Sequence, residues 1–177
     1  KTTLDYFKRQ DVDIKIISGD DPVTVSAIAR RCHLLNYEHY IDVSSLSDEQ
    51  IKEAIEKYTI FGRVSPKQKQ LMVNALQENN HTVAMTGDGV NDVLALKAAD
   101  CSIAMASGSD AAKSASHIVL LKNNFNAMPH IVNEGRRVIN NITASASMYL
   151  IKTIFSVVLS IGMILFGHGY PFKPIQL

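Results

Sequence analysis

Five short apolar runs, rich in β-branched residues, alternate with stretches of helical periodicity over most of the chain. Strands that alternate with helices are joined by right-handed crossovers, which place the strands side by side in a parallel sheet with helices on both faces. The pattern therefore predicts an α/β fold built on a parallel sheet. The expected strands are residues 14–18, 59–62, 82–86, 101–105 and 117–121.

Polar residues suited to capping stand where the expected helices begin. Asp21 can cap a helix whose first turn holds Pro22, and Ser47 with Gln50 has the spacing of a capping box. Asp100 is expected to cap or brace the sheet and to take no part in chemistry. The expected helices are residues 22–32, 48–57, 66–79 and 91–98.

Charge and composition narrow the classes of partner. The net charge is +1 and the chain has no tryptophan, so neither a basic stripe nor an aromatic platform indicates nucleic acid. Cys32 and Cys101 match no metal-binding spacing, which suits reduced thiols in a reducing compartment. The first residues are polar and lack an initiator methionine, so we expect a fragment of a longer polypeptide.

Residues 148–166 form an apolar segment with a single charge in nineteen positions. As a helix, this segment would extend about 28 Å, close to the ~30 Å of a bilayer hydrocarbon core. Arg136 and Arg137 precede it, which places that end in the cytoplasm by the positive-inside rule. We therefore expect a transmembrane helix in contact with lipid, with residues 1–147 cytoplasmic. The alternative is a buried core helix.

One polar stripe crosses the apolar segment. Lys152, Ser156 and Ser160 recur every four residues, and Thr153 is adjacent to Lys152. Because charges inside membranes are costly, such a stripe indicates a transport path in which Lys152 serves as countercharge or substrate contact. Alternatively, Lys152 extends towards the membrane surface while the small residues pack against other helices.

Polar residues follow three of the expected strands. Ser18-Gly19-Asp20 closes the first strand, Arg63 and Lys69 follow the second, and Asp88 with Asp92 follows the third. In an open parallel sheet, ligands bind at the carboxyl ends of the strands. A hydroxyl, an ammonium and paired carboxylates at one edge predict a phosphoryl-transfer site.

The turn at residues 86–92 supplies the acidic side of that site. Glycines permit a sharp turn there, and Asp88 and Asp92 lie one helical turn apart, so both carboxylates could serve Mg²⁺. Asn91 could orient the surrounding ligands. Ser18 and the Gly19 amide could donate hydrogen bonds to phosphate, and Lys69 could neutralise it.

These segments resemble motifs of the haloacid-dehalogenase-like superfamily and, within it, of the P-type ATPases, the cation and lipid pumps of membranes. Ser18-Gly19-Asp20 resembles the second motif, residues 63–69 the third, with Lys69 as the phosphate-contacting lysine, and residues 86–92 the fourth. The resemblance covers essentially the whole chain. It implies a Rossmann-like sheet, ATP and Mg²⁺ as cofactors, and an aspartyl-phosphate intermediate. It assigns Ser18, Gly19, Asp20 and Lys69 to catalysis, and Thr86 and Gly87 to cofactor binding.

The superfamily's nucleophile is missing. P-type ATPases carry it in an Asp-Lys-Thr-Gly sequence after a strand, and no such sequence occurs here. In the family's sheet, that strand lies between those represented here by residues 14–18 and 82–86. We therefore expect this chain to be inactive without the rest of the pump. The implied segments are a partial phosphorylation domain (1–124), a stalk helix (125–147), a transmembrane helix (148–166) and a loop towards the next membrane helix (167–177).

The resemblance implies a multi-pass pump of the cell membrane that moves a cation. Calcium pumps place an Asn and a Glu where Thr153 and Ser156 stand here, which puts a calcium site of that type in doubt. A lipid flippase of the same superfamily is an alternative, since flippases also carry a lysine in this helix. A membrane-anchored phosphatase and a regulatory fragment are further alternatives.

Overall fold

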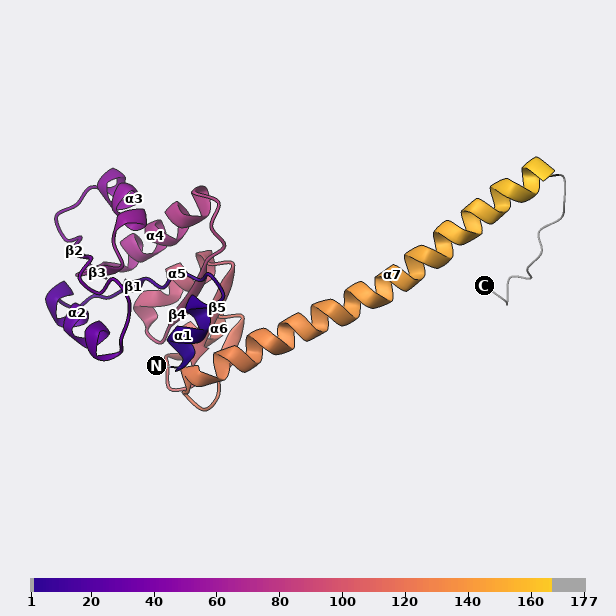
Figure 1. Ribbon diagram of the computed structural model, residues 1–177. Coiled ribbons are helices and arrows are strands. Elements are labelled where there is room, and N and C mark those ends of the chain that lie inside the picture. The colour runs from indigo at the N-terminus through magenta and orange to yellow at the C-terminus, as the bar shows by residue number, and fades with distance from the viewer. Residues whose placement is uncertain (1, 167–177) are drawn as a thin grey trace. The chain divides into compact units, whose positions relative to one another are not determined.

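The computed structural model describes residues 2–166, and the chain divides into two units, residues 1–129 and 130–177. Helices and strands alternate through the first unit (Figure 1). The expected loop at 167–177 lies outside the described residues. In chain order the elements are α1 (Thr2–Lys8), β1 (Ile16–Ile17), α2 (Pro22–Arg31), β2 (Tyr40–Asp42), α3 (Asp48–Lys57), β3 (Ile60–Gly62), α4 (Pro66–Glu78), β4 (Ala84–Gly87), η1 (Val90–Asp92), α5 (Val93–Ala98), β5 (Cys101–Met105), α6 (Asp110–Ala115), β6 (Ile118–Leu120), η2 (Phe125–Ala127) and α7 (Met128–Phe166).

The six described strands form two parallel sheets of three strands each, in the orders β1-β3-β2 and β4-β5-β6. All four strand pairs are parallel, which confirms the predicted α/β class. β1 and β4 are both edge strands, each paired on one side only. These are the two strands that the family resemblance places on either side of the missing nucleophile strand.

Within the first unit, helix α4 contributes side chains to the hydrophobic cores beside both three-stranded sheets. Its Met72 and Ala75 belong to a cluster that includes the fully buried Phe61 of β3. Its Val73 packs instead with Ala95 of α5 in a second cluster. Each large apolar side chain that is fully buried stabilises the fold by ~1.5–3 kcal/mol, so α4 is held firmly from both sides.

The helix-start signals predicted from sequence are confirmed. Asp21 accepts hydrogen bonds from the first turn of α2, and Ser47 with Gln50 forms a complete capping box on α3. Three elements, α1, β2 and α6, are not among those predicted from the sequence. β2 is a three-residue edge strand with an exposed Tyr40 and a charged Asp42, so its sequence does not read as a buried apolar run.

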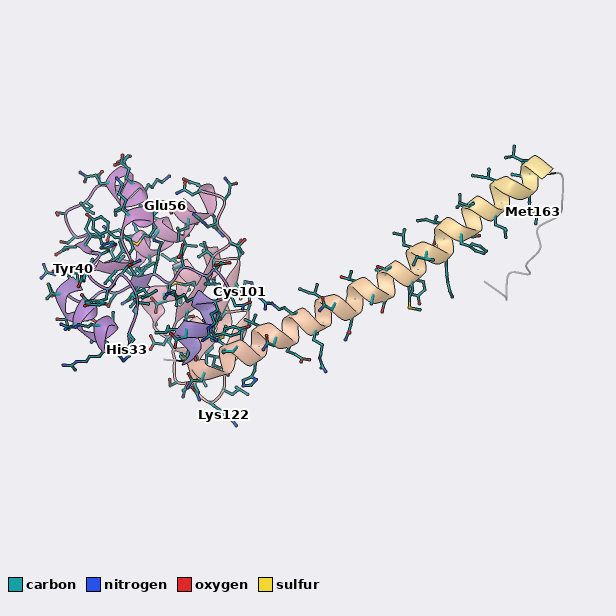
Figure 2. The ribbon with its side chains drawn as sticks, viewed as in Figure 1. His33, Tyr40, Glu56, Cys101, Lys122 and Met163 are labelled. Atoms are coloured by element: carbon teal, nitrogen blue, oxygen red, sulfur yellow. The ribbon has the colours of Figure 1, made fainter. Side chains whose placement is uncertain are left out.

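The second unit consists, among described residues, of the continuation of α7. This helix of 39 residues is unbroken through residue 166, as the sequence pattern predicted. It contains an 18-residue window of mean hydropathy 2.0, none of it buried, and side chains project from all sides of it (Figure 2). By length and composition the helix could cross a membrane. The boundary between stalk and membrane segment at 147/148 stays a prediction.

Candidate functional site

The turn after β4 is closed by the side chain of Asp92. Its Oδ2 accepts hydrogen bonds from the Gly89 amide at 3.1 Å and the Asp88 amide at 3.3 Å. The turn leaves no room for a side chain at Gly87, because a Cβ there would lie 2.6 Å from the Asp92 Cβ. Asp92 therefore shapes the turn from which Asp88 projects.

Lys69 and Asp92 form the most buried ion pair among the described residues. The Lys69 Nζ lies 2.6 Å from the Asp92 Oδ1, and the two side chains are only 12% and 11% exposed. A charge-assisted hydrogen bond at such a site is strong and geometrically specific. The sequence predicts Lys69 as a phosphate contact and Asp92 as a metal ligand, whereas in the structure the two side chains bond to each other.

Asp88 is the free carboxylate of the turn. Its side chain is exposed and makes no hydrogen bond or ion pair within the part of the chain that the structure describes. Its backbone is fixed from the far side, because the Ser109 amide donates to the Asp88 carbonyl at 2.8 Å. A Cβ on Gly108 would lie 2.8 Å from the same carbonyl oxygen.

Gly108 and Ser109 are not among the site residues predicted from the sequence. The signal was present, since both follow the strand at 101–105 and therefore lie at the same carboxyl edge as Asp88. Ser109 also caps α6 by accepting a hydrogen bond from the Ala112 amide. The loop after β5 thus supports the acidic turn through its backbone.

The Ser18–Asp20 turn is fastened to the segment that leads into α4. The Val64 amide donates to the Ser18 carbonyl at 3.0 Å, and the Arg63 amide donates to the Asp20 carbonyl at 2.8 Å. Within the turn, the Ser18 Oγ donates to the Asp20 carboxylate and accepts from the Asp20 amide, both at 3.1 Å. The hydroxyl expected to contact phosphate is thus oriented by Asp20.

A capping box sets the position of Lys69. Ser65 accepts a hydrogen bond from the Gln68 amide, and the Gln68 Oε1 accepts one from the Ser65 amide. Pro66 occupies the first turn, where its fixed φ suits a helix start. Lys69 follows directly, so it extends from a firmly capped first turn of α4.

The arrangement fits magnesium only in part. Residues 2–166 contain no group of three or more His, Cys, Asp or Glu side chains able to hold a metal ion. Mg²⁺ takes six ligands, and it commonly uses one or two carboxylates with water and phosphate oxygens. Asp88 can supply one such carboxylate, and the engaged Asp92 could act through water. The remaining ligands must come from elsewhere.

Among the described residues, the side chains of Asn91 and Thr86 add no hydrogen bond or ion pair to this network. Asn91 and Thr86 are exposed, on η1 and β4. On α7, the Thr153 hydroxyl donates to the Tyr149 carbonyl at 2.9 Å and the Ser160 hydroxyl to the Ser156 carbonyl at 2.8 Å. Such bonds use the hydroxyl protons within the helix and leave oxygen lone pairs available to a ligand.

Comparison with known proteins identifies the family. The protein-family model described as haloacid dehalogenase-like hydrolase matches residues 1–100, more than half of the 177-residue chain. The chain belongs to the haloacid dehalogenase-like hydrolase family. The predicted superfamily is therefore confirmed.

The chain is also similar to curated ion-pump proteins. It is 50% identical over 183 residues to the "Probable cation-transporting ATPase exp7" of Streptococcus pneumoniae, covering 99% of this chain and 24% of that protein. It is 51% identical over 163 residues to the "Calcium-transporting ATPase CtpE" of Mycobacterium bovis, covering 91% of this chain and 20% of that protein. The chain thus spans about a quarter or less of these relatives.

Solved structures of the same kind share the fold. A zinc-transporting PIB-type ATPase in its E2.Pi state gives a TM-score of 0.72 at 27% identity, covering 92% of this chain and 23% of that one. The catalytic domain of the CPx-ATPase CopB-B gives 0.57 at 26% identity, covering 73% of this chain and 42% of that one. The fold shared with the zinc-transporting ATPase thus covers 92% of this chain.

Proposed function

We propose that this chain is part of an ATP-driven P-type pump that moves a cation across a membrane through an aspartyl-phosphate intermediate. The observation that carries the proposal is the buried Lys69–Asp92 pair at the turn of Asp88, in a chain 50% identical over 99% of its length to a protein named as a cation-transporting ATPase. A buried cation beside an exposed carboxylate suits a phosphoryl group held together with a divalent ion.

Each residue of the site has a role in this proposal. Lys69 supplies positive charge to the phosphoryl group, and Asp92 holds Lys69 in place. The Gly19 amide donates a hydrogen bond to a phosphoryl oxygen, and Ser18 does the same once its hydroxyl proton turns away from the Asp20 carboxylate. Asp88 would hold Mg²⁺ together with water and phosphate oxygens, and the ion would supply positive charge for the transferred phosphoryl group. Asn91 steadies these ligands, and Thr86 with Gly87 borders the bound cofactor.

The nucleophile comes from the rest of the pump. β1 and β4 each have one unpaired edge, and an uncovered strand edge exposes backbone groups that favour pairing with another strand. A strand inserted between them would join the two sheets into one and would end at the same carboxyl edge as Ser18 and Asp88. An aspartate after that strand would face both residues.

Calcium is the first cargo to test, because a relative that is 51% identical is named as a calcium-transporting ATPase. Residues 148–166 contain no Asp or Glu, so carboxylate ligands for calcium would come from other helices. Thr153, Ser156 and Ser160 would add only neutral oxygen atoms, with Lys152 as a built-in charge. Uptake of radiolabelled calcium into vesicles, with other divalent cations as competitors, tests the choice.

The decisive experiment measures phosphoenzyme in the intact pump. Asp88→Ala should abolish magnesium-dependent phosphoenzyme formation from ATP, because the exposed carboxylate of the turn is lost. Asp110→Ala is a matched control, since Asp110 is also an acid at the carboxyl edge but its side chain is 97% exposed and paired with Lys113. Near-normal phosphoenzyme in Asp88→Ala would contradict the proposed function.

A further inference from the structure

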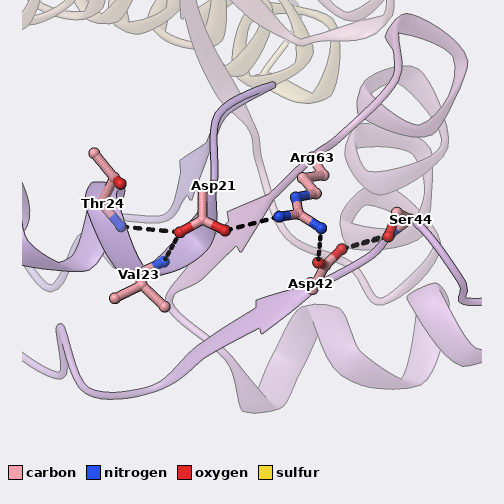
Figure 3. A network of polar contacts seen from close by, with 6 residues as sticks. All are labelled: Asp21, Val23, Thr24, Asp42, Ser44 and Arg63. Atoms are coloured by element: carbon pink, nitrogen blue, oxygen red, sulfur yellow. Dashed lines mark hydrogen bonds and ion pairs between the residues drawn. The ribbon is translucent and has the colours of Figure 1, made fainter.

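One side chain connects the carboxyl ends of all three strands in the first sheet. Arg63 follows β3, Asp21 lies in the turn after β1, and Asp42 is the last residue of β2. The Arg63 Nη2 lies 3.1 Å from the Asp21 Oδ1, and its Nη1 lies 3.1 Å from the Asp42 Oδ2. Figure 3 shows the guanidinium between the two carboxylates. We call these three residues the Arg63 clamp.

Both carboxylates are already fixed by their own loops. The second oxygen of Asp21 accepts from the Val23 amide at 3.1 Å and the Thr24 amide at 3.4 Å, at the start of α2. The second oxygen of Asp42 accepts from the Ser44 hydroxyl at 2.6 Å and the Ser44 amide at 2.9 Å. Arg63 therefore meets two anchored acceptors and acquires a fixed orientation from them.

The charged state of Asp42 is favoured by the same contacts. Hydrogen bonds from the Ser44 hydroxyl and amide lower the pKa of Asp42, and the nearby Arg63 adds a smaller lowering effect. The lowered pKa favours the ionised form of Asp42, which is the form that pairs with Arg63.

The backbone of Arg63 is also unusual. Its φ is 55°, in the left-handed region that residues with side chains seldom adopt. The preceding residue, Gly62, has no room for a Cβ, which would lie 2.5 Å from Pro22 atoms. A backbone held in this region persists where surrounding contacts over-determine it, and such residues cluster at functional sites. The chain turns here and leads directly to the capped start of α4.

We propose that Arg63 is a positioning residue of the phosphoryl-transfer site, an inference that rests on the proposed function. Its clamp and its left-handed backbone fix the Ser18–Asp20 turn relative to the first turn of α4, from which Lys69 extends. The side chains of Arg63, Asp21 and Asp42 are 54%, 43% and 37% exposed, so the ion pairs add little to overall stability. Their contribution is geometric.

The test compares two phosphorylation reactions in the intact pump. Phosphoenzyme forms from ATP in the forward direction and from inorganic phosphate by reversal of the hydrolysis step, which involves no nucleotide. Arg63→Ala should slow both reactions by about 10- to 100-fold and leave the KM for ATP nearly unchanged. Arg63→Lys should not restore the rate, because one ammonium cannot replace a planar fork that bridges two carboxylates.

Further variants separate the clamp from the backbone and from folding. Arg63→Gly relieves the strain of the positive φ but also lacks the clamp, so both phosphorylation reactions should remain slow in this variant. Asp42→Asn keeps the side-chain shape, should fold, and should slow both reactions less than Arg63→Ala. In the double variant that combines Arg63→Ala with Asp42→Asn, the effect of Asp42→Asn should largely disappear, since the two residues share one interaction. Lys52→Ala, which breaks another exposed ion pair, Lys52–Glu78 at 2.8 Å, should leave both rates unchanged.

Each other result contradicts the inference in its own way. A rise in the KM for ATP with a normal reaction from inorganic phosphate would make Arg63 a nucleotide contact. A normal phosphorylation rate in Arg63→Gly would mean that only the backbone conformation at this position matters. If the effects of Asp42→Asn and Arg63→Ala simply added in the double variant, the clamp would be ruled out. Normal phosphoenzyme in all Arg63 variants would refute the inference alone, whereas no phosphoenzyme in the wild-type pump would refute the proposed function first.

Discussion

At the scale of single residues, Asp92 has a different part from the one its sequence position indicates. Spacing alone makes it a partner of Asp88, but its two oxygens are directed at Lys69 and at the amides of the turn. One carboxylate thus orients a cation from another helix and shapes the turn that presents a second carboxylate. Because Asp92 contacts both Lys69 and the turn, it fixes the position of the ammonium group relative to the Asp88 carboxylate.

Gly87→Ala tests how tightly this turn is packed. The added Cβ would lie 2.6 Å from the Asp92 Cβ and 3.0 Å from its Oδ2, so Asp92 must move and its bond to Lys69 must lengthen. We expect a loss of about 1–3 kcal/mol in the free energy of unfolding, measured by urea unfolding of the 177-residue chain in detergent. Phosphoenzyme formation by the intact pump should fall as well.

Gly135→Ala is the matched control for that substitution. A Cβ at Gly135, within α7, would meet nothing within 4 Å, and alanine favours a helix by up to about 1 kcal/mol over glycine. Helix stability should therefore rise or stay unchanged. If both substitutions change the free energy of unfolding by the same amount, the tight contact between Gly87 and Asp92 is not the cause of the loss of stability.

At the scale of elements, Asp100 braces the start of the second sheet, as the sequence predicted. Its Oδ2 accepts a hydrogen bond from the Val83 amide at 2.8 Å, joining the residue before β5 to the residue before β4. This bond lowers the pKa of Asp100, and a hydrogen bond from Gln77 contributes further. Separation of the two strands removes these hydrogen bonds and returns the pKa of Asp100 towards its ordinary value.

The pH dependence of unfolding measures that brace. Because the pKa of Asp100 is lower in the folded state, its stabilisation is fully present above the ordinary aspartate value of about 3.9 and is lost as the pH falls through the folded value. Asp100→Asn should therefore reduce the drop in urea midpoint between pH 6 and pH 3. Other carboxylates contribute equally to both chains, so an identical drop in wild type and variant would exclude the brace.

Local chemistry explains which elements could be predicted. The caps at Asp21, Ser47 and Ser65 depend on residues close in sequence, so the corresponding helix starts were visible in the chain. β2 depends instead on its pairing with β3, and the Lys69–Asp92 bond on packing between α4 and α5. Such long-range contacts leave no periodic signal. The Arg63 clamp was hidden for the same reason.

At the scale of the whole molecule, the division into two sheets is the main departure from the expected single sheet. Every strand pair within each half is parallel, and α4 packs against both halves. Among the described residues, no strand pairs with both β1 and β4. The sequence contains no Asp-Lys-Thr-Gly, and a strand that carried such a motif would fit between these two open edges.

Hydrogen exchange of edge amides tests this completion of the sheet. In a parallel strand, alternate residues bond to opposite neighbours. Because the Ile16 and Ser18 amides donate to the β3 side, the Ile17 amide faces the open edge of β1. By the same alternation, the Ala84 and Thr86 amides face the open edge of β4, since the Val83 carbonyl accepts from Cys101 of β5.

We therefore expect the Ile17, Ala84 and Thr86 amides to exchange quickly in the 177-residue chain and slowly in the intact pump. Ile16 and Ser18 are internal controls, because their bonds to the β3 side exist in both proteins and should protect them in both. A strand that pairs with only one sheet would protect either Ile17 or the two β4 amides, but not all three. Equal exchange at all three positions in both proteins would mean that no strand fills the gap, and the nucleophile would then have to reach Asp88 from outside the sheet.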